Sequence, residues 1–137
     1  MDEFDYITDR GQQAIRDMFG SDNDDDRLQA YARRLTDQVD ADWARIMVSY
    51  ITEGMYSRQV LTTAQRELCA VAALTVLQRS AELESHIDIA LNSNPVEHVR
   101  EVILQMSVYG GVPVTFTTLD LLGQVLAQRA ARGNPEA

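Results

Sequence analysis

The apolar run LCAVAALTVL, from Leu68 to Leu77, constrains the fold of this chain more than any other stretch. Thr62 and Gln65 precede it with the T-x-x-Q spacing of a capping box, which predicts a helix that ends near Leu77. Because the run is apolar on nearly all sides, we expect this helix to be buried at the centre of the fold. Cys69, the only cysteine, lies inside the run and is interpreted as a small core residue rather than a nucleophile.

Two breaks in the following sequence delimit three more helices. The first break, NSNP, follows a helix over Ser80–Leu91 and holds a second capping pattern, in which Asn94 and Glu97 flank Pro95 at the first helical position. The helix predicted from Pro95 to Val108 places four apolar residues inward: Val99, Val102, Ile103 and Met106.

The second break is the glycine pair Gly110 and Gly111, and Pro113 then starts a last helix that runs to about Ala131. No stretch shows the period-two alternation of a strand with flanking turn signals, so the sequence predicts an all-α fold of six or seven helices. We expect one domain over residues 1–137, with a core from about 40 to 131 and an N-terminal helical extension over 1–39.

The N-terminal third of the chain predicts a short helix, an acidic run and a longer helix. Thr8 is a suitable N-cap and Gly20 a suitable stop for a helix over Thr8–Phe19. The run Ser21–Asp26 lacks the glycine and the distal glutamate of a calcium-binding loop. We therefore interpret it as an acidic lead into the next helix rather than as a metal site.

The longer helix is predicted from an amphipathic pattern over Arg27–Tyr50, which Asp37–Asp42 could divide into two. Glu53 and Gly54 end this stretch, and Met55–Val60 is expected to be a connector. The apolar and aromatic residues that recur at intervals of three or four are Leu28, Tyr31, Leu35, Val39, Trp43, Ile46, Met47 and Tyr50.

The charge of the chain excludes several classes of function. Its 12 basic residues, all arginine, face 21 acidic ones, which gives a formal net charge of −9. Binding to nucleic acid or to an anionic membrane surface needs clustered positive charge, so we expect neither partner. Without lysine the chain cannot form a Schiff base with a substrate carbonyl.

Cysteine and histidine usage argues against redox and metal chemistry. One cysteine allows neither an intrachain disulfide nor a Cys-x-x-Cys pair, and two histidines without an HExxH motif predict no metal site. The N-terminus, MDEFDYITD, is acidic and unlike a signal or transit peptide, and no apolar run approaches the roughly 20 residues of a membrane span. We expect a cytoplasmic protein.

Three polar residues at the start of the helix predicted over Ser80–Leu91 and within it form a candidate acid–base site. Arg79, Glu82 and His86 stand at i, i+3 and i+7, which places them on one face of a helix. A guanidinium can hold a carboxylate, and an imidazole can transfer a proton near neutral pH. The competing interpretation is an ordinary Glu–His pair that stabilises a helix by about 0.2–0.5 kcal/mol. His98 lies outside this pattern and is interpreted as a surface residue.

Several fragments, in this order, resemble the carboxymuconolactone decarboxylase family, a branch of the alkylhydroperoxidase-D-like superfamily. The resemblance covers almost the whole chain. It includes the upstream Gly11, Arg16, Phe19-Gly20 and Trp43, and its main fragments are Tyr56-Ser57-Arg58, Arg66-Glu67-Leu68, Glu82-Leu83-Glu84-Ser85-His86, Arg100-Glu101-Val102 and Tyr109-Gly110-Gly111-Val112-Pro113. It implies the superfamily's all-α helical bundle.

The resemblance also implies which residues form the site. The peroxidases of the superfamily carry Glu, then Cys-x-x-Cys-x-x-x-His; placed on this chain, the glutamate falls on Glu67 and the histidine on His86. The two cysteines fall on Arg79 and Glu82, so thiol peroxidase chemistry is excluded. Arginine and glutamate at these places are what the decarboxylase branch implies.

The chain departs from the family at two places near this motif. Decarboxylase members usually carry Gly and Trp where Gln78 and Ser80 stand, and a Pro-Gly turn where Gln59-Val60 stands. A missing tryptophan beside the site implies room for a different or larger substrate, so the sequence leaves the substrate open.

The resemblance thus implies a decarboxylase-like enzyme that acts without a cofactor on a small unsaturated acid or lactone. Related proton-transfer reactions, such as isomerisation or cyclisation, and a non-catalytic binding subunit remain alternatives. Family members form rings of dimers, which implies a homo-oligomer, trimeric or hexameric. The expected catalytic residues are His86, Glu82 and Glu67, and the expected substrate-binding residues are Arg79, Arg58, Tyr109 and Trp43.

Overall fold

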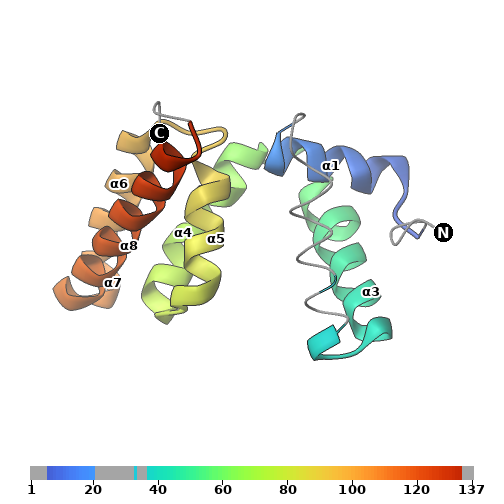
Figure 1. The fold of residues 1–137 in the computed structure, drawn as a ribbon, viewed down its shortest axis with the longest axis horizontal. Coiled ribbons are helices and arrows are strands. Elements are labelled where there is room, and N and C mark those ends of the chain that lie inside the picture. Colours follow the sequence, from blue (N-terminus) through green and yellow to red (C-terminus); the bar gives the residue numbers. More distant parts are fainter. Residues whose placement is uncertain (1–5, 21–32, 34–36, 134–137) are drawn as a thin grey trace. The chain divides into compact units, whose positions relative to one another are not determined.

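The computed structural model describes residues 6–20, 33 and 37–133, and every regular element in them is a helix (Figure 1). The all-α fold predicted from the sequence is therefore confirmed. The chain divides into two compact units, Met1–Thr63 and Ala64–Ala137, and each is described by itself. Within the described ranges, no helix combines the length and apolar character that a membrane span requires.

The first unit contains α1 (Asp9–Phe19), α3 (Ala41–Ser49) and the π-helix η1 (Tyr50–Tyr56). The predicted limits of α1 are confirmed, with Thr8 as N-cap and Gly20 ending the helix at φ 87°. In Figure 1, α1 crosses the η1 end of the continuous α3–η1 helix. The acidic run Ser21–Asp26 and the predicted helix before residue 37 lie outside the described residues.

The end predicted at Glu53 and Gly54 for the amphipathic stretch Arg27–Tyr50 is wrong, because the chain continues as η1 through both residues. The Ser57 N–H bonds to the Thr52 carbonyl at 2.9 Å, five residues back, which is the π-helical pattern. The Ser57 hydroxyl also donates to the carbonyl of Glu53. These bonds use backbone acceptors near the end of η1, so the connector starts later than predicted.

The apolar stripe predicted on this helix is not its buried face. Val39, Trp43, Ile46 and Tyr50 are exposed within the chain, whereas Ala44 and Val48 are buried. Val48 forms a small apolar cluster with Ile7 and Ile15, and Tyr6 and Phe19 pack against it. Ala44 and Val48, rather than the large apolar residues, therefore lie on the side of α3 that packs inside the unit.

Gly11 permits this close approach of α1 to η1. A Cβ atom built at Gly11 would lie 2.5 Å from Ile7 Cγ2 and 2.7 Å from Glu53 Cγ, so a larger residue would push the helices apart. Glu53 in turn accepts the Thr8 N–H at the start of α1. Hydrogen bonds from the Thr8 side chain and backbone, helped by the nearby Arg10 charge, lower the pKa of Glu53.

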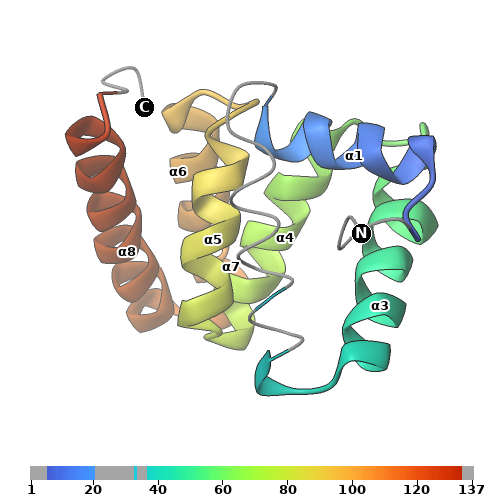
Figure 2. The same ribbon diagram turned by 45° about the vertical axis from the view of Figure 1, so that its right-hand side comes forward.

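The second unit contains α4 (Thr63–Leu77), α5 (Ser80–Ala90), α6 (Val96–Gln105), α7 (Ser107–Gly110) and α8 (Val112–Ala131). Figures 1 and 2 show α4, α5 and α8 side by side. One apolar core joins four of these helices, and its buried members are Val71, Leu83, Ile87, Ala90, Leu91, Val99, Ile103, Leu122 and Val125.

The limits of α4 agree with the prediction, but its burial does not. Only Glu67, Val71 and Thr75 are buried, at intervals of four residues on one face. Cys69 is exposed, so its assignment to the core is wrong. It lies two residues from Glu67, which turns it about 200° around the helix, away from the face that packs within the chain.

The capping pattern predicted before α6 is also wrong in detail. Pro95 is the N-cap, with an extended backbone, rather than the first helical residue. The Asn94 side chain does not cap α6; its amide nitrogen donates to the carbonyls of Ala64 and Ala90. The helix ends at Gln105, earlier than predicted, because Met106 bonds to both the third and the fourth preceding carbonyl and the chain turns into α7. Val99 and Ile103 are fully buried as expected, and Val102 and Met106 partly so.

A buried ion pair that no sequence pattern indicates joins α5 to α8. Arg129 Nη1 lies 2.8 Å from Asp88 Oδ1 and 3.1 Å from Asn92 Oδ1, and it also bonds to the Asp88 carbonyl at 3.0 Å. Arg132 Nη2 approaches the same carboxylate oxygen at 3.0 Å. The two helices are therefore tied at their C-terminal ends, so this cluster is a structural clamp.

A left-handed residue closes the turn between α4 and α5. Gln78 has φ 55°, the only positive φ of a non-glycine residue in the described ranges. Its N–H bonds to the Thr75 carbonyl at 3.2 Å, and the Arg79 N–H bonds to the Leu74 carbonyl at 3.1 Å. These two bonds define a Schellman motif, in which glycine normally takes the left-handed position. Members of the family that the sequence resembles usually carry glycine here, whereas this chain holds a glutamine in a strained conformation.

We predict that Gln78→Gly stabilises the protein by about 0.5–1 kcal/mol. Left-handed backbone costs a non-glycine residue about 1–2 kcal/mol, and the extra freedom of glycine in the unfolded chain offsets only part of that gain. Urea unfolding followed by circular dichroism measures the difference. The control is Gln124→Gly inside α8, which should cost about 1 kcal/mol. Destabilisation by both substitutions would contradict the assigned strain.

Candidate acid–base site

The side chains of Glu67 and His86 meet between α4 and α5. Glu67 Oε2 lies 2.8 Å from His86 Nδ1. Glu67 is on the buried face of α4, and His86 is near the middle of α5, on the side that faces α4. Of the two glutamates expected to be catalytic, Glu67 and Glu82, the one that contacts His86 in the structure is Glu67.

The two members of the pair differ sharply in exposure. The Glu67 side chain is fully buried, whereas 29% of the His86 side chain is accessible. Glu67 Oε1 is buried as well, and it has no hydrogen-bond partner among the described residues. A buried carboxylate oxygen without a partner costs stability, so this arrangement is typical of a site kept for its chemistry. A helix-stabilising surface pair would look different, with both groups exposed.

The hydrogen bond determines which imidazole nitrogen is available. An ionised carboxylate can only accept, so Nδ1 of His86 must carry the hydrogen in this contact. The second nitrogen, Nε2, is then the one that can give a proton to a ligand or take one from it. Glu67 thus orients the ring and determines which of its two nitrogens faces away from the carboxylate.

Arg79 and Glu82 occupy the same helix as His86 but do not join the pair. Arg79 is the N-cap residue of α5, and Glu82 lies in its first turn. Both are exposed, and neither side chain makes a hydrogen bond or ion pair to any described residue. Their charges are therefore available to a ligand.

The remaining predicted residues lie at separate places. Tyr109 is in α7 and is largely exposed. Trp43 and Arg58 belong to the first unit, Trp43 in α3 and Arg58 just after η1, and both are exposed. The structure assembles Glu67 and His86 and leaves the roles of these three as predictions.

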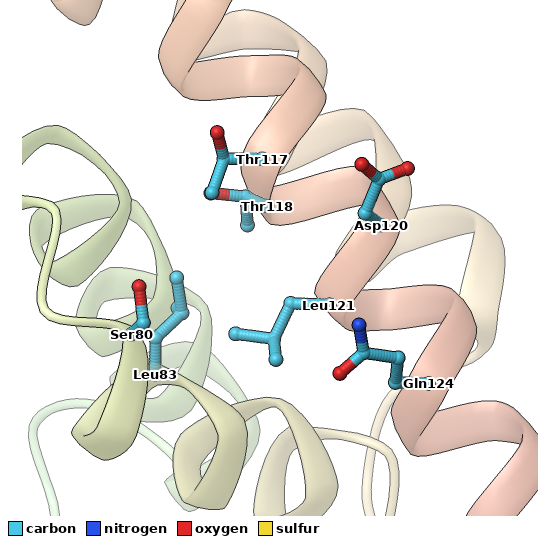
Figure 3. A pocket seen from close by; sticks show the side chains of 7 residues that line it. All are labelled: Ser80, Leu83, Thr117, Thr118, Asp120, Leu121 and Gln124. Atoms are coloured by element: carbon cyan, nitrogen blue, oxygen red, sulfur yellow. The ribbon is translucent and has the colours of Figure 1, made fainter.

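An open groove of about 330 Å³ lies between α5 and α8 (Figure 3). Leu121 points across it from α8 toward α5. Ser80, which stands where the family usually carries tryptophan, borders this hollow. None of the predicted site residues does; the lining is Ser80, Leu83, Thr117, Thr118, Asp120, Leu121 and Gln124.

The described residues contain no group of three or more histidine, cysteine, aspartate or glutamate side chains that could hold a metal ion. The polar groups of the site are the Glu67–His86 pair and, toward the N-terminal end of α5, the charged side chains of Arg79 and Glu82. The fold and the site thus define a class of protein: all-helical, with a buried glutamate that orients a partly exposed histidine.

Comparison with protein families identifies the class further. The model of the carboxymuconolactone decarboxylase family matches residues 41–124, more than half of the chain. The chain belongs to this family. No curated protein matches it.

We predict that the loss of protein stability depends on which member of the Glu67–His86 pair is removed. His86→Leu should lower the free energy of unfolding by about 3 kcal/mol, because it takes from the buried Glu67 carboxylate the one partner that it has among the described residues. Glu67→Leu should cost little, since the partly exposed His86 can turn to water. The double variant should return to near wild-type stability. Denaturant unfolding measures the free energy of unfolding of all three variants. An unchanged free energy of unfolding in His86→Leu would show that the contact does not form.

Proposed function

We propose that this protein is a cofactor-independent acid–base enzyme that decarboxylates a small unsaturated acid or lactone. The observation that carries the proposal is the 2.8 Å contact of the buried Glu67 with Nδ1 of His86, which leaves Nε2 for the substrate. Membership of the carboxymuconolactone decarboxylase family supports this reaction type.

The pair supplies what such a decarboxylation needs. The bond between the substrate carbon and its carboxylate breaks, CO₂ leaves, and the electron pair remains on the carbon as an enolate conjugated with the unsaturated carbonyl. The protonated His86 donates its Nε2 hydrogen to that carbon and becomes neutral, with Nδ1 still bonded to Glu67. A proton from solvent then restores the imidazolium.

Arg79 is the residue proposed to bind the substrate carboxylate. Its guanidinium has no ion-pair partner in the described part of the chain, and it stands two turns before His86 along α5. A guanidinium can bind a carboxylate through two parallel hydrogen bonds. Arg58, Tyr109 and Trp43 are proposed as further substrate contacts, and Glu82 as a second carboxylate close to the path of the proton.

Other functions would place different requirements on these residues. An isomerase or cyclase would need the same proton transfer at Nε2 without loss of CO₂, so product analysis distinguishes it from a decarboxylase. A thiol peroxidase would need two cysteines where Arg79 and Glu82 stand, and the chain has one cysteine, elsewhere on α4. In a non-catalytic subunit, the cost of burying Glu67 with one oxygen unbonded would have no functional explanation.

We predict that His86→Gln lowers turnover by about 10² or more, because the proton donor is lost. Glutamine can still donate a hydrogen bond to Glu67, so the fold should remain intact. The assay measures CO₂ release from a panel of unsaturated γ-lactones that carry a carboxylate. His98→Gln is the matched control, since His98 is exposed in the first turn of α6 and should be dispensable.

The comparison is valid when circular dichroism and oligomer size are the same in all three proteins. If His86→Gln turns over substrate as fast as the wild type under these conditions, His86 does not transfer the proton. Equal losses in His86→Gln and His98→Gln would point to a general structural effect instead.

We also propose that the protein forms a homo-oligomer, a trimer or hexamer. Val108 in α7 and Val112 and Phe116 in α8 are exposed within nine residues of one another, although they are large and apolar. Light scattering at micromolar concentration should give a multiple of the mass of one chain. Val108→Asp should shift the mass toward the monomer by placing a charge in the contact. A monomeric wild-type protein would contradict the proposal.

A further inference from the structure

The side chain of Asn94 connects α4 to α5. Its Nδ2 atom lies 3.1 Å from the carbonyl oxygen of Ala64 and 3.0 Å from that of Ala90. Ala64 is in the first turn of α4, and Ala90 is the last residue of α5. The two hydrogens of one amide group therefore join the start of one helix to the end of the other.

This bridge lies beside the Glu67–His86 contact. Glu67 follows Ala64 by three residues, and His86 precedes Ala90 by four, so each lies about one turn, or roughly 5–6 Å, from the bridged carbonyl of its own helix. The covalent connection between the helices, at Gln78 and Arg79, is about 15 Å from Glu67 along α4. The bridge is thus the nearer polar restraint on the pair.

Apolar packing alone does not fix the geometry that the pair needs. Val71 of α4, with Leu68 and Leu74 beside it, packs into the core that contains Leu83 and Ile87 of α5. Such contacts hold two helices together but tolerate small sliding, whereas a hydrogen bond weakens steeply with distance and angle. A directional bond at each helix is needed to hold Glu67 Oε2 at 2.8 Å from His86 Nδ1.

The chemistry of the bridge selects an amide. Both acceptors are backbone carbonyls, so the bridging atom must donate twice, which the NH₂ of asparagine does and a carboxylate cannot. Pro95 follows directly and disfavours a helical backbone at Asn94, so the residue stays in the turn from which its side chain reaches both helices.

We propose that Asn94 is the positioning residue of the Glu67–His86 pair. By joining the Ala64 and Ala90 carbonyls, it fixes the register of α4 against α5, so that the buried carboxylate meets Nδ1 and Nε2 faces the substrate. The effect on turnover rests on the proposed function, and the effect on the hydrogen bond does not.

The test compares Asn94→Asp and Asn94→Ala with Ser93→Ala. Asn94→Asp keeps the shape and removes both donors, and Asn94→Ala removes the side chain. Ser93 is an exposed neighbour in the same turn and its side chain makes no hydrogen bond to a described residue, so it is the matched control. The chain has only two histidines, so the ring N–H proton of ¹⁵N-histidine-labelled protein is assigned by comparison with His98→Gln.

The wild type and Ser93→Ala should show an exchange-protected Nδ1–H proton of His86 by NMR. Both Asn94 variants should lose it while their circular dichroism stays unchanged. Their turnover should fall about tenfold or more, because small misplacements of catalytic groups are costly.

The proposal is overturned if both Asn94 variants keep the protected proton. It is also overturned if both lose their whole fold, since Asn94 would then stabilise the unit in general. A protected proton that depends on Asn94, in a protein that releases no CO₂ from any substrate of the panel, would support the positioning role and contradict the proposed function.

Discussion

The contact on which the proposed chemistry depends is a buried carboxylate against a partly exposed imidazole. Glu67 takes a place on the inner face of α4 that an apolar residue would fill at lower cost, and one of its oxygens finds no partner in the described structure. The remaining oxygen binds Nδ1 of His86. The cost of burying Glu67 is explained if its role is to orient the imidazole ring of His86.

Four other features of the unit hold the helices around that contact. The apolar core around Val71 and Ile87 sets the distance between α4 and α5. The Schellman turn at Gln78 closes one end of the helix pair, and the Asn94 amide closes the other. The Arg129 clamp then ties α5 to α8. The family match over residues 41–124 and the helices of the structure agree on an all-α fold.

Local patterns predict the helices well because their signals are local. Gly20 and Gly111 take the positive φ angles that end helices, and the apolar spacing of α6 indicates the correct inner residues, Val99 and Ile103. Burial and pairing depend on what packs across the chain, which periodicity does not show. The apolar run of α4 therefore predicts the wrong environment for Cys69, and the face shared by Glu82 and His86 does not reveal that the bonded partner lies on another helix. The bridging role of Asn94 is hidden for a similar reason, because its sequence pattern fits a cap equally well.

The central claim is that Glu67 fixes the tautomer of His86 and leaves Nε2 as the atom that exchanges protons with the substrate. A long-range ¹H–¹⁵N NMR spectrum of ¹⁵N-histidine-labelled protein, recorded at a pH where the rings are neutral, tests this most directly, because it distinguishes protonated from unprotonated ring nitrogens. We expect His86 to carry its hydrogen on Nδ1 in the wild type and to lose this preference in Glu67→Leu. Contradiction would be a His86 ring with its hydrogen on Nε2 in the wild type, or a tautomer that Glu67→Leu leaves unchanged.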